Sequence, residues 1–531
     1  MKAFLMQKDR DFDPAQTLTR REAERLHNRG RAATELPLPW NQAALRQDLG
    51  LDVIFKAMAA EDVLLYEVAQ MALMSSLTDM DTIGYRQRIV ADCLKNPYIV
   101  RAMYRIAVEA IEQERANYWS SFNRYPTGTL HHAVDVMQMF VGKLRQLRKI
   151  ADQQSDRFQS DGLLALFAML RRELSDSYFV EVDRHLGRLK FPRGVLISAG
   201  LGEGNKGKNY TLRKLPDDTR NWLARRLFAE RLQGYSFKLH PRDDAGARAL
   251  SVLNDRGVNL AANALAQSTD HILSFFKMLR TELAFYVGCL NLRERLAQLG
   301  EPICFPAPYP VAERRSSFTG LYDAALALSM GRRVVANDLE DGHRKLVIVT
   351  GANTGGKSTF LRSIGLCQLM MQAGMFVPAE SFAAAICEGV YTHYRREEDL
   401  AMESGKWDEE LGRMSEIVDR LTPNSLMLFN ESFASTNERE GSEIAGQIVG
   451  ALLDREIRVV FVTHLYHFAH AFAENRREGT TFLRAERRPD GTRPFKLIVA
   501  EPLETSYGED LYRKIFADED ECETPAEAAA Q

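Results

Sequence analysis

Hydrophobic positions divide the chain into a helical part and a part in which strands and helices alternate. From Asn41 to about Asn117 apolar residues recur at the three- and four-residue spacing of a helix, and this period continues over about residues 130–190. Between Ala245 and Gly300 no proline interrupts the period, which predicts a long connecting helix. The pattern therefore indicates an all-α core and lever region over residues 41–300.

One segment of this region has the pattern of a β-hairpin. Residues 191–216 contain an apolar run, a turn bearing Gly and Lys, and a second, alternating run. From Gly204 to Arg248 eleven basic residues face five acidic ones, in a chain whose formal net charge is −3. Such a stretch is typical of contact with the phosphate backbone of DNA, and a solvated charged surface is the alternative. The candidate DNA contacts are Lys206, Lys208, Arg213 and Lys214.

After a proline-rich link at residues 301–310 the pattern changes. Apolar runs at Lys345–Thr350, Ser425–Asn430 and Ile457–Thr463 are separated by helical stretches, which predicts βαβ units and a mainly parallel sheet. The predicted organisation in chain order is an extended lead-in (1–40), the helical region (41–300), an α/β domain (311–515) and an acidic, disordered tail (516–531).

Composition and charge exclude several classes of protein. With 45% hydrophobic and 27% charged residues, the 531-residue chain is neither collagen-like, wholly disordered nor coiled coil throughout. The N-terminus lacks the pattern of a secretory signal and no stretch approaches the roughly 18 apolar residues of a membrane span, so we expect a cytoplasmic protein without a membrane partner. Six scattered cysteines without a Cys-x-x-Cys pair argue against a zinc site or a disulfide framework.

A glycine-rich motif follows the first of the predicted parallel strands. Residues 351–358 read G-x-x-x-x-G-K-S between an apolar strand and a helix, which is the context of a P-loop. The backbone N–H groups of such a loop bind phosphate, and the N-terminus of the following helix adds its dipole. Lys357 is expected to reach the β- and γ-phosphates of ATP, and Ser358 to ligate Mg²⁺. The predicted nucleotide-binding residues are Asn353, Thr354, Gly355, Gly356, Lys357, Ser358 and Thr359.

Two further strands end in residues suited to ATP hydrolysis. One ends at Glu431, the candidate general base for the attacking water. Asn430 stands where an Asp usually holds Mg²⁺, and an amide keeps the shape but not the charge, which predicts weaker metal binding and slower hydrolysis. The next strand brings His464 to the same edge, where it is suited to sensing the γ-phosphate. A metal site at His464, His467 and His470 is the alternative, but their spacing drifts about 60° per step around a helix and no Cys or carboxylate joins them.

Together these motifs resemble the ATPase domain of the MutS family of DNA mismatch-repair and recombination proteins. The similar segments are TGANTGGKSTFLRSIGLCQLMMQAGMFVPAE, NESFASTNEREGSEIA and VTHLYHF. The resemblance implies an ABC-type, P-loop ATPase that uses ATP and Mg²⁺ and forms a homodimer. It also implies that a signature loop of one subunit, here Ser435, Thr436 and Asn437 before Gly441, completes the nucleotide site of the other. An ordinary helix N-cap is the alternative for Thr436.

The sequence departs from the family pattern at several places. Lys406 and Trp407 replace the usual residues of a Ser-bearing nucleotide loop, and Val334 stands where an adenine-stacking aromatic is expected. The family's mismatch readers carry an N-terminal domain with a Phe-x-Glu wedge, whereas core-like helices begin here almost at once. The Phe-x-Glu matches at Phe179, Phe228 and Phe472 lie in helical stretches outside the expected region. We therefore expect a form without that domain, and recognition of DNA by its shape, through paired lever arms, stays open.

These inferences combine into one predicted function. The chain is expected to be a MutS-like DNA-binding ATPase whose ATP-driven dimer closure controls clamping on duplex or branched DNA, in mismatch repair or recombination, together with other repair or recombination proteins. Two alternatives stay open. One is an ATP-gated scaffold with little hydrolysis, and the other is a MutS-like ATPase that acts on a protein or RNA partner.

Overall fold

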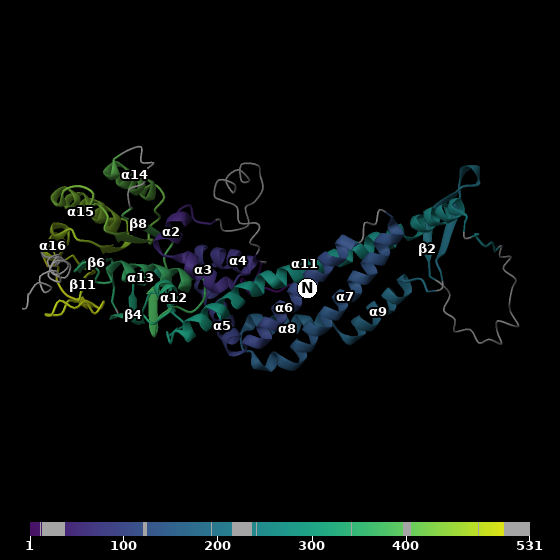
Figure 1. Ribbon diagram of the computed structural model, residues 1–531, viewed down its shortest axis with the longest axis horizontal. Coiled ribbons are helices and arrows are strands. Elements are labelled where there is room, and N and C mark those ends of the chain that lie inside the picture. The colour runs from purple at the N-terminus through teal and green to yellow at the C-terminus, as the bar shows by residue number, and fades with distance from the viewer. Residues whose placement is uncertain are drawn as a thin grey trace, which may run out of the picture. The chain divides into compact units, whose positions relative to one another are not determined.

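The chain folds into two units. A computed structural model (Figure 1) describes residues 1–10, 12, 38–120, 125–192, 194–214, 236–240, 242–340, 342–396, 405–475 and 477–503. Unit 1 contains Met1–Ala3, Tyr98–Phe158 and Leu163–Arg280; unit 2 contains Phe4–Pro97, Gln159–Gly162 and Thr281–Gln531. The predicted acidic tail lies outside the described residues.

Unit 1 is built mainly from helices, where the helical period predicts them. Phe140 and Phe276 pack in its core with ring centroids 5.4 Å apart. The Ser175 side chain accepts the Tyr178 N–H and so caps the last helix before the hairpin. The helices are α6 (Pro97–Ser120), α7 (Pro126–Gln154), α8 (Asp161–Glu173), α9 (Asp176–Leu189) and the part of α11 (Asp244–Gln298) up to Arg280, with 3₁₀ turns η2 (Ser155–Arg157) and η3 (Glu203–Asn205).

An antiparallel hairpin lies in unit 1 at the place where the sequence analysis expects one. Strand β1 (Leu196–Leu201) pairs with β2 (Gly207–Arg213), and Leu196 stands opposite Arg213. The hairpin packs on α11 so closely that a Cβ added to Gly257 would lie 2.4 Å from Ile197 Cδ1. The glycine therefore permits the contact between the hairpin and the helix.

The α/β part of unit 2 contains the expected, mainly parallel sheet. Its strand order is β12-β11-β6-β10-β9-β8, and only β12 runs antiparallel to its neighbour among the described strands. The strands are β6 (Leu346–Gly351), β8 (Val390–Tyr394), β9 (Leu426–Asn430), β10 (Arg458–Val462), β11 (Thr480–Ala485) and β12 (Leu497–Val499). Helices α14 (Lys406–Val418), α15 (Glu438–Asp454) and α16 (Tyr466–Glu474) share one apolar core with the sheet, in which Phe429 stacks on Phe461 with centroids 4.8 Å apart.

A second sheet of four short strands lies in the same unit and was not predicted. Its order is β3-β7-β4-β5, formed by β3 (Ala307–Tyr309), β4 (Ser316–Leu321), β5 (Asn337–Leu339) and β7 (Ser381–Ala385), with η4 (Val311–Glu313) and α12 (Ala324–Met330) beside it in the chain. The remaining helices of unit 2 are α2 (Gln42–Asp48), α3 (Leu51–Ala59), α4 (Val63–Met74), α5 (Met80–Lys95) and the end of α11 from Thr281.

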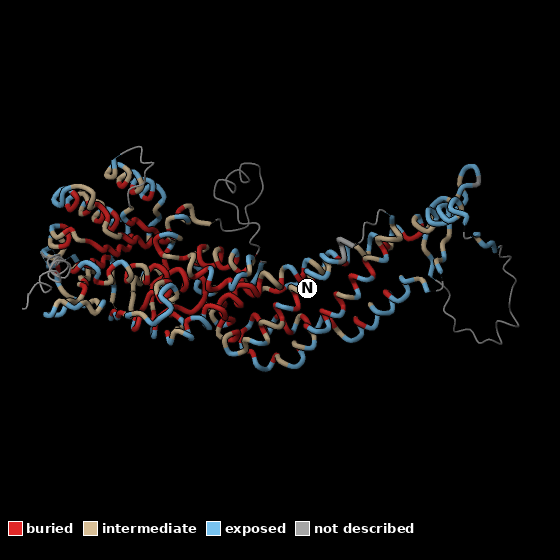
Figure 2. Tube along the Cα trace, in the orientation of Figure 1, coloured by how far each residue is buried: buried red, intermediate tan, exposed pale blue. Residues whose placement is uncertain are grey.

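Helix α13 (Lys357–Gln372) is tied to its surroundings by two buried glutamines. Figure 2 shows how thoroughly this part of the chain is buried. The Gln372 amide nitrogen donates to Leu77 O at 2.9 Å and to Cys387 O at 2.8 Å, and its oxygen accepts the Cys387 N–H at 3.1 Å. Gln368 donates to the Gln372 oxygen at 2.7 Å and to Ala385 O at 3.1 Å. Both amides are thus used to join α13 to neighbouring main chain.

Leu5, Met6 and Phe12, near the start of the chain, are built into the core of unit 2 around a buried carboxylate. Glu282 on α11 is fully buried and accepts the N–H groups of Leu5, Met6 and Phe12 at 2.9, 2.6 and 2.9 Å. Arg86, also buried, donates to Met6 O at 2.6 Å. This part of the predicted lead-in is therefore anchored, because Glu282 supplies acceptors that no strand or helix provides.

Burial of Glu282 makes the stability of the protein depend on pH. Desolvation raises its pKa from 4.5 to about 7, and the three N–H donors only partly oppose this. Because the folded pKa is raised, the stabilising contribution is complete below about pH 4.5 and is lost as the pH rises to about 7, a change of roughly 3 kcal/mol. We expect Glu282→Gln to flatten the dependence of the unfolding free energy on pH, measured by urea unfolding between pH 5 and 8. Parallel curves for the wild type and the variant would contradict this.

Candidate active site

A tight turn joins β6 to α13 at the glycine-rich motif. Gly351 and Gly356 have φ values of +104° and +87°, which only glycine adopts readily. A Cβ added to Gly351 would lie 2.9 Å from the Ala485 nitrogen. Lys357 folds back over the turn, and its Nζ donates to Gly351 O and Ala352 O at 2.9 Å each. The turn thus has the compact backbone that phosphate cradling requires.

The Lys357 ammonium is held in a poorly solvated position. Burial lowers its pKa from 10.5 to about 8, and the nearby Glu431 carboxylate opposes this only in part. Such a lysine is stabilised when an anion replaces the two main-chain oxygens that accept its hydrogen bonds. The residue therefore suits the binding of phosphate rather than a structural ion pair.

If this turn binds ATP, as the sequence predicts, the affinity should fall above pH 8. With a pKa of about 8, the charged fraction of Lys357 drops about tenfold between pH 7 and pH 9, so we expect the Kd for ATP to rise about tenfold. Titration with a fluorescent ATP analogue at each pH measures this. In Lys357→Arg the guanidinium stays charged, and the pH dependence should disappear whatever the absolute affinity. A Kd for the wild type that stays constant to pH 9 would contradict the prediction.

The first residues of α13 meet the end of β9. Ser358 Oγ donates to Asn430 Oδ1 at 2.9 Å. A hydroxyl and an amide oxygen are hard ligands of the kind that Mg²⁺ accepts, although a carboxylate is usual. Among the described residues no group of three or more His, Cys, Asp or Glu could hold a metal by itself. The pair therefore suits a magnesium ion that arrives with phosphate oxygens and retains water.

The residues that follow β9 and β10 also lie together. His464 Nε2 lies 3.3 Å from Glu431 Oε1, and both side chains are partly exposed. His464 is the main cause of a lowered pKa of Glu431, with a further contribution from Lys357. Glu431 has a left-handed backbone, with φ at +54°. The carboxylate is thus kept ionised, the state in which it can accept a proton from water.

A cavity of about 570 Å³ opens beside the glycine-rich turn. Phe495, which precedes β12, is part of its wall together with Val334. Arg493, from the same segment, donates to Asn353 O and Thr354 Oγ1. The predicted residues that line the cavity are Asn353, Thr354, Gly355, Gly356, Lys357, Ser358, Thr359 and Glu431.

Sequence reasoning missed Phe495 and Arg493. It noted that no aromatic residue stands at Val334, but an aromatic ring reaches the same cavity from more than 150 residues further along the chain. The only local signal is the short apolar run of β12, which gives no indication of which residues pack on the turn. The main-chain oxygen of Phe495 would lie 3.4 Å from a Cβ added to Gly356, which is ordinary van der Waals contact, so the segment packs directly on the turn.

The predicted signature loop precedes α15. Asn437 is the N-cap of this helix, and its Oδ1 accepts the Glu440 N–H at 3.0 Å. Thr436 Oγ1 donates to Glu440 Oε2 at 2.9 Å. The N-cap considered for Thr436 is thus provided by Asn437. None of Ser435, Thr436 and Asn437 is among the residues lining the cavity of the same chain.

Other residues singled out in the sequence have structural neighbours. Lys406 and Trp407 begin α14, and the Trp407 ring meets the Phe433 ring edge-on with centroids 6.4 Å apart. His467 and His470 lie on α16, where His470 Nδ1 is 3.6 Å from the Glu474 carboxylate. The three-histidine metal site is therefore not formed by the described residues.

The candidate DNA contacts lie in unit 1. Lys206, Lys208, Arg213 and Lys214 are all exposed and belong to the hairpin or its ends. Arg213 Nε donates to Ser198 Oγ at 2.8 Å on the paired strand. Residues 215–235 of the basic stretch lie outside the described residues. No described helix has the length and apolar character needed to cross a membrane.

Comparison with known proteins gives matches to both parts of the chain. Residues 78–299 match the family model of the MutS2 N-terminal domain, and residues 347–520 match that of MutS domain V. DNA mismatch repair protein MutS from Thermus aquaticus is 36% identical over 158 residues, which are 30% of this chain and 17% of that protein. Its namesakes from Thermotoga petrophila and Synechocystis are each 37% identical, over 131 and 138 residues.

These relatives are matched over a limited part of their length. The Thermotoga match covers 24% of this chain and the Synechocystis match 25%, and each covers 16% of the relative. The chain thus spans about a sixth of the length of the curated relatives it matches. The helical part and the α/β part nevertheless match models of the same family, and the relatives carry its name. The chain belongs to the MutS family.

Proposed function

We propose that the protein is a cytoplasmic ATPase that couples ATP binding and hydrolysis to closure of a homodimer on DNA. The observation that carries this proposal is the meeting of Lys357, Ser358 and Glu431 at one cavity, at the edge where the parallel strands end. In parallel α/β sheets this edge is where ligands bind. Membership of the MutS family supports the same assignment.

The residues around the cavity fit ATP. The amides of the turn and the Lys357 ammonium would hold the phosphates, and the Phe495 ring would lie against the adenine in place of an aromatic at Val334. Ser358 and Asn430 would hold Mg²⁺, which when bound neutralises charge on the phosphate oxygens. Glu431 would then take a proton from the attacking water, and His464 would keep the Glu431 carboxylate ionised and oriented.

Dimer closure would bring the signature loop of one subunit to the cavity of the other. Ser435, Thr436 and Asn437 stand at the N-terminus of the 17-residue helix α15, which favours contact with an anion. They do not line the cavity of their own chain, so a second subunit is needed to supply them. ATP would thus stabilise the closed dimer, and hydrolysis would release it.

Clamping on DNA would use the hairpin of unit 1. We expect binding to duplex or branched DNA to weaken with salt and to differ between ADP and a non-hydrolysable ATP analogue. Reversing the charges of Lys206, Lys208, Arg213 and Lys214 to Glu should lower the affinity and reduce the salt slope by about 0.9 for each phosphate that is no longer neutralised. Equilibrium binding to homoduplex, mismatched, single-stranded and four-way-junction DNA measures both, and the preferred DNA separates repair from recombination.

A matched control reverses four exposed charges elsewhere. Glu replaces Lys56, Lys95, Lys149 and Arg455, which changes the net charge by the same amount. An equal loss of DNA affinity in both variants would show only a general effect of charge. No binding to any DNA in either nucleotide state would remove the DNA part of the proposal and direct the search to protein or RNA partners.

A scaffold that binds ATP with little turnover is the second candidate function. The observation that favours it is Asn430, because an amide attracts Mg²⁺ less than a carboxylate does. Phosphate release distinguishes the two functions. A wild-type rate no higher than that of Lys357→Ala would support the scaffold, and a clearly higher rate would support the ATPase.

A further inference from the structure

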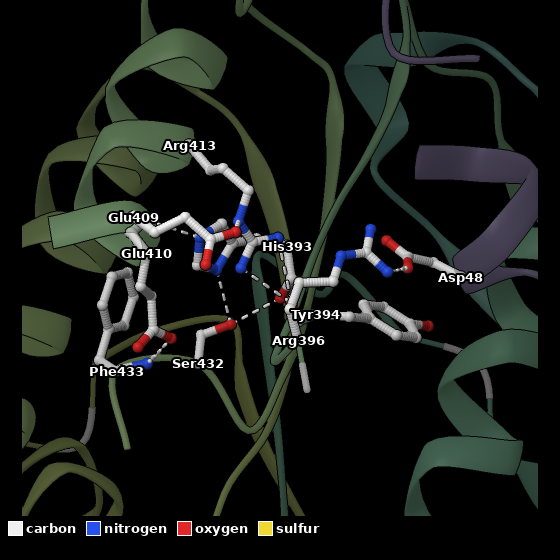
Figure 3. A network of polar contacts seen from close by, with 9 residues as sticks. All are labelled: Asp48, His393, Tyr394, Arg396, Glu409, Glu410, Arg413, Ser432 and Phe433. Carbon is white, nitrogen blue, oxygen red and sulfur yellow. Dashed lines mark hydrogen bonds and ion pairs between the residues drawn. The ribbon is translucent and has the colours of Figure 1, made fainter. Parts of the chain in front are cut away.

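Behind the candidate base, a buried polar network joins three elements of unit 2. Figure 3 shows His393 on β8, Ser432 and Phe433 in the turn after β9, and Glu410 on α14. His393 and Ser432 are fully buried, and Glu410 nearly so. Phe433 packs against the His393 ring with centroids 5.4 Å apart and ring planes 17° apart. The proposed catalytic steps use none of these side chains.

The turn itself has an unfavourable backbone. Glu431 and Phe433 both have positive φ values, +54° and +64°, which cost free energy for residues with a side chain. Such a conformation persists only when surrounding contacts enforce it. The contacts that hold this turn therefore also fix the direction of the Glu431 carboxylate.

Glu410 provides one of these contacts. Its Oε1 accepts the Phe433 N–H at 2.5 Å, a short bond. Within the described part of the chain its Oε2 is buried and has no hydrogen-bond partner. The carboxylate is thus removed from water and makes its side-chain hydrogen bond to the turn. Burying polar atoms away from water is costly unless they are hydrogen-bonded, and the bond to the Phe433 N–H offsets part of this cost.

His393 and Ser432 provide the second contact. A carbonyl oxygen only accepts, so His393 Nε2, 3.1 Å from Glu410 O, must carry the proton. Burial lowers the pKa of His393 to about 4, and the neutral ring therefore leaves Nδ1 as an acceptor, 2.8 Å from Ser432 Oγ. The Ser432 hydroxyl also lies 2.6 Å from His393 O, so either interaction joins the turn to β8. The hydroxyl has one proton, which goes to Nδ1 or to His393 O, so His393 links α14 to the residue next to Glu431 through its ring or through its main-chain oxygen.

From this geometry we infer that Glu410 is a positioning residue for Glu431. Its carboxylate, assisted by the His393–Ser432 bridge, holds the left-handed turn and so aims the base at the attacking water. The inference rests on the proposed ATPase function. It predicts that loss of the Glu410 acceptor slows the chemical step and leaves ATP binding intact.

The test compares two substitutions at one position. Glu410→Gln keeps an acceptor for the Phe433 N–H, and Glu410→Met fills the same space without one. We expect Glu410→Met to lower kcat at least tenfold, because small misplacement of a catalytic group has effects of up to about a hundredfold. Its Kd for a fluorescent ATP analogue should stay within about twofold of the wild type. Glu410→Gln should recover kcat to within about threefold.

Two further variants keep the test decisive. Glu409→Met alters the neighbouring residue, whose carboxylate pairs with Arg413 at 3.5 Å and does not bond to the turn, and it should leave kcat unchanged. Ser432→Ala removes the bridge to β8 with little change in volume and should lower kcat with an unchanged Kd. If thermal melting shows that Glu410→Met does not fold, the kcat and Kd of Ser432→Ala compared with the wild type become the test of the inference.

The contradicting outcomes are distinct. Full activity of Glu410→Met or of a folded Ser432→Ala, against an active wild type, would remove the inference alone. Equal losses in Glu410→Gln and Glu410→Met would show that charge, not the bond to Phe433, matters, which also overturns it. A wild-type rate no higher than that of Lys357→Ala would remove the proposed function, and the inference with it.

Discussion

Glu431→Gln is expected to lower the rate of ATP hydrolysis by about 10² to 10⁴-fold while ATP binding persists. The amide has the shape of the carboxylate but cannot accept a proton from water, and general-base catalysis contributes about this much. The Lys357 contacts and the cavity wall stay in place, so the Kd for ATP should change little. Single-turnover hydrolysis and titration with a fluorescent analogue measure the two quantities separately.

The same substitution at Glu416 serves as the control. Glu416 is an exposed residue of α14, and its replacement by Gln should alter neither quantity. If Glu431→Gln hydrolyses ATP at the wild-type rate, Glu431 is not the base. If it also loses ATP binding, the carboxylate acts on the bound state rather than on the chemical step.

Gly441→Ala is expected to damage both stability and turnover. A Cβ added here would lie 2.2 Å from Phe433 O, and because that oxygen belongs to the main chain, the turn after β9 or α15 must move. Overpacking of this kind costs about 1–3 kcal/mol. We expect a lower melting temperature and a fall in kcat of more than tenfold, because the displaced turn carries Glu431.

Gly450→Ala on the same helix provides the matched control. It has no heavy atom within 4 Å of the added Cβ, so only the helix propensity changes, which favours Ala by about 1 kcal/mol. The melting temperature should therefore rise in Gly450→Ala and fall in Gly441→Ala. A rise in both would show that α15 has room at Gly441 and would overturn the packing argument.

The main elements of the α/β part could be predicted because their signals are local. The mainly parallel sheet follows from apolar runs of six or seven residues. Strands β9 and β10 lie within the predicted segments, and β6 ends one residue beyond its segment, at Gly351. The four-stranded sheet escaped prediction because β3 and β5 have only three residues each, too few to show an alternating pattern. Burial of Leu5 and Met6 also has no local signal, since it depends on Glu282, more than 270 residues away.

The candidate site could likewise be predicted where its signals are local, and not where it depends on residues distant in sequence. The glycine-rich turn, Glu431 and His464 stand at strand ends, and strand order places such residues at one edge. Phe495 and Glu410 reach the site through packing between segments that are distant in sequence. In the sequence, His393 in particular looks like an ordinary residue of a buried strand. Its neighbours, not its own sequence context, give it a role.

In the proposed ATPase, the glutamines of α13 limit how the binding of ATP can be transmitted. A piston-like shift of this helix would separate Gln372 from Leu77 and Cys387 and leave buried amides unsatisfied, at a cost of about 1–3 kcal/mol each. Helix α13, which begins at the glycine-rich turn, is therefore a fixed frame for the site. We expect the signal to leave instead through the start of α15, where the side-chain hydrogen bonds of Thr436 and Asn437 are exposed.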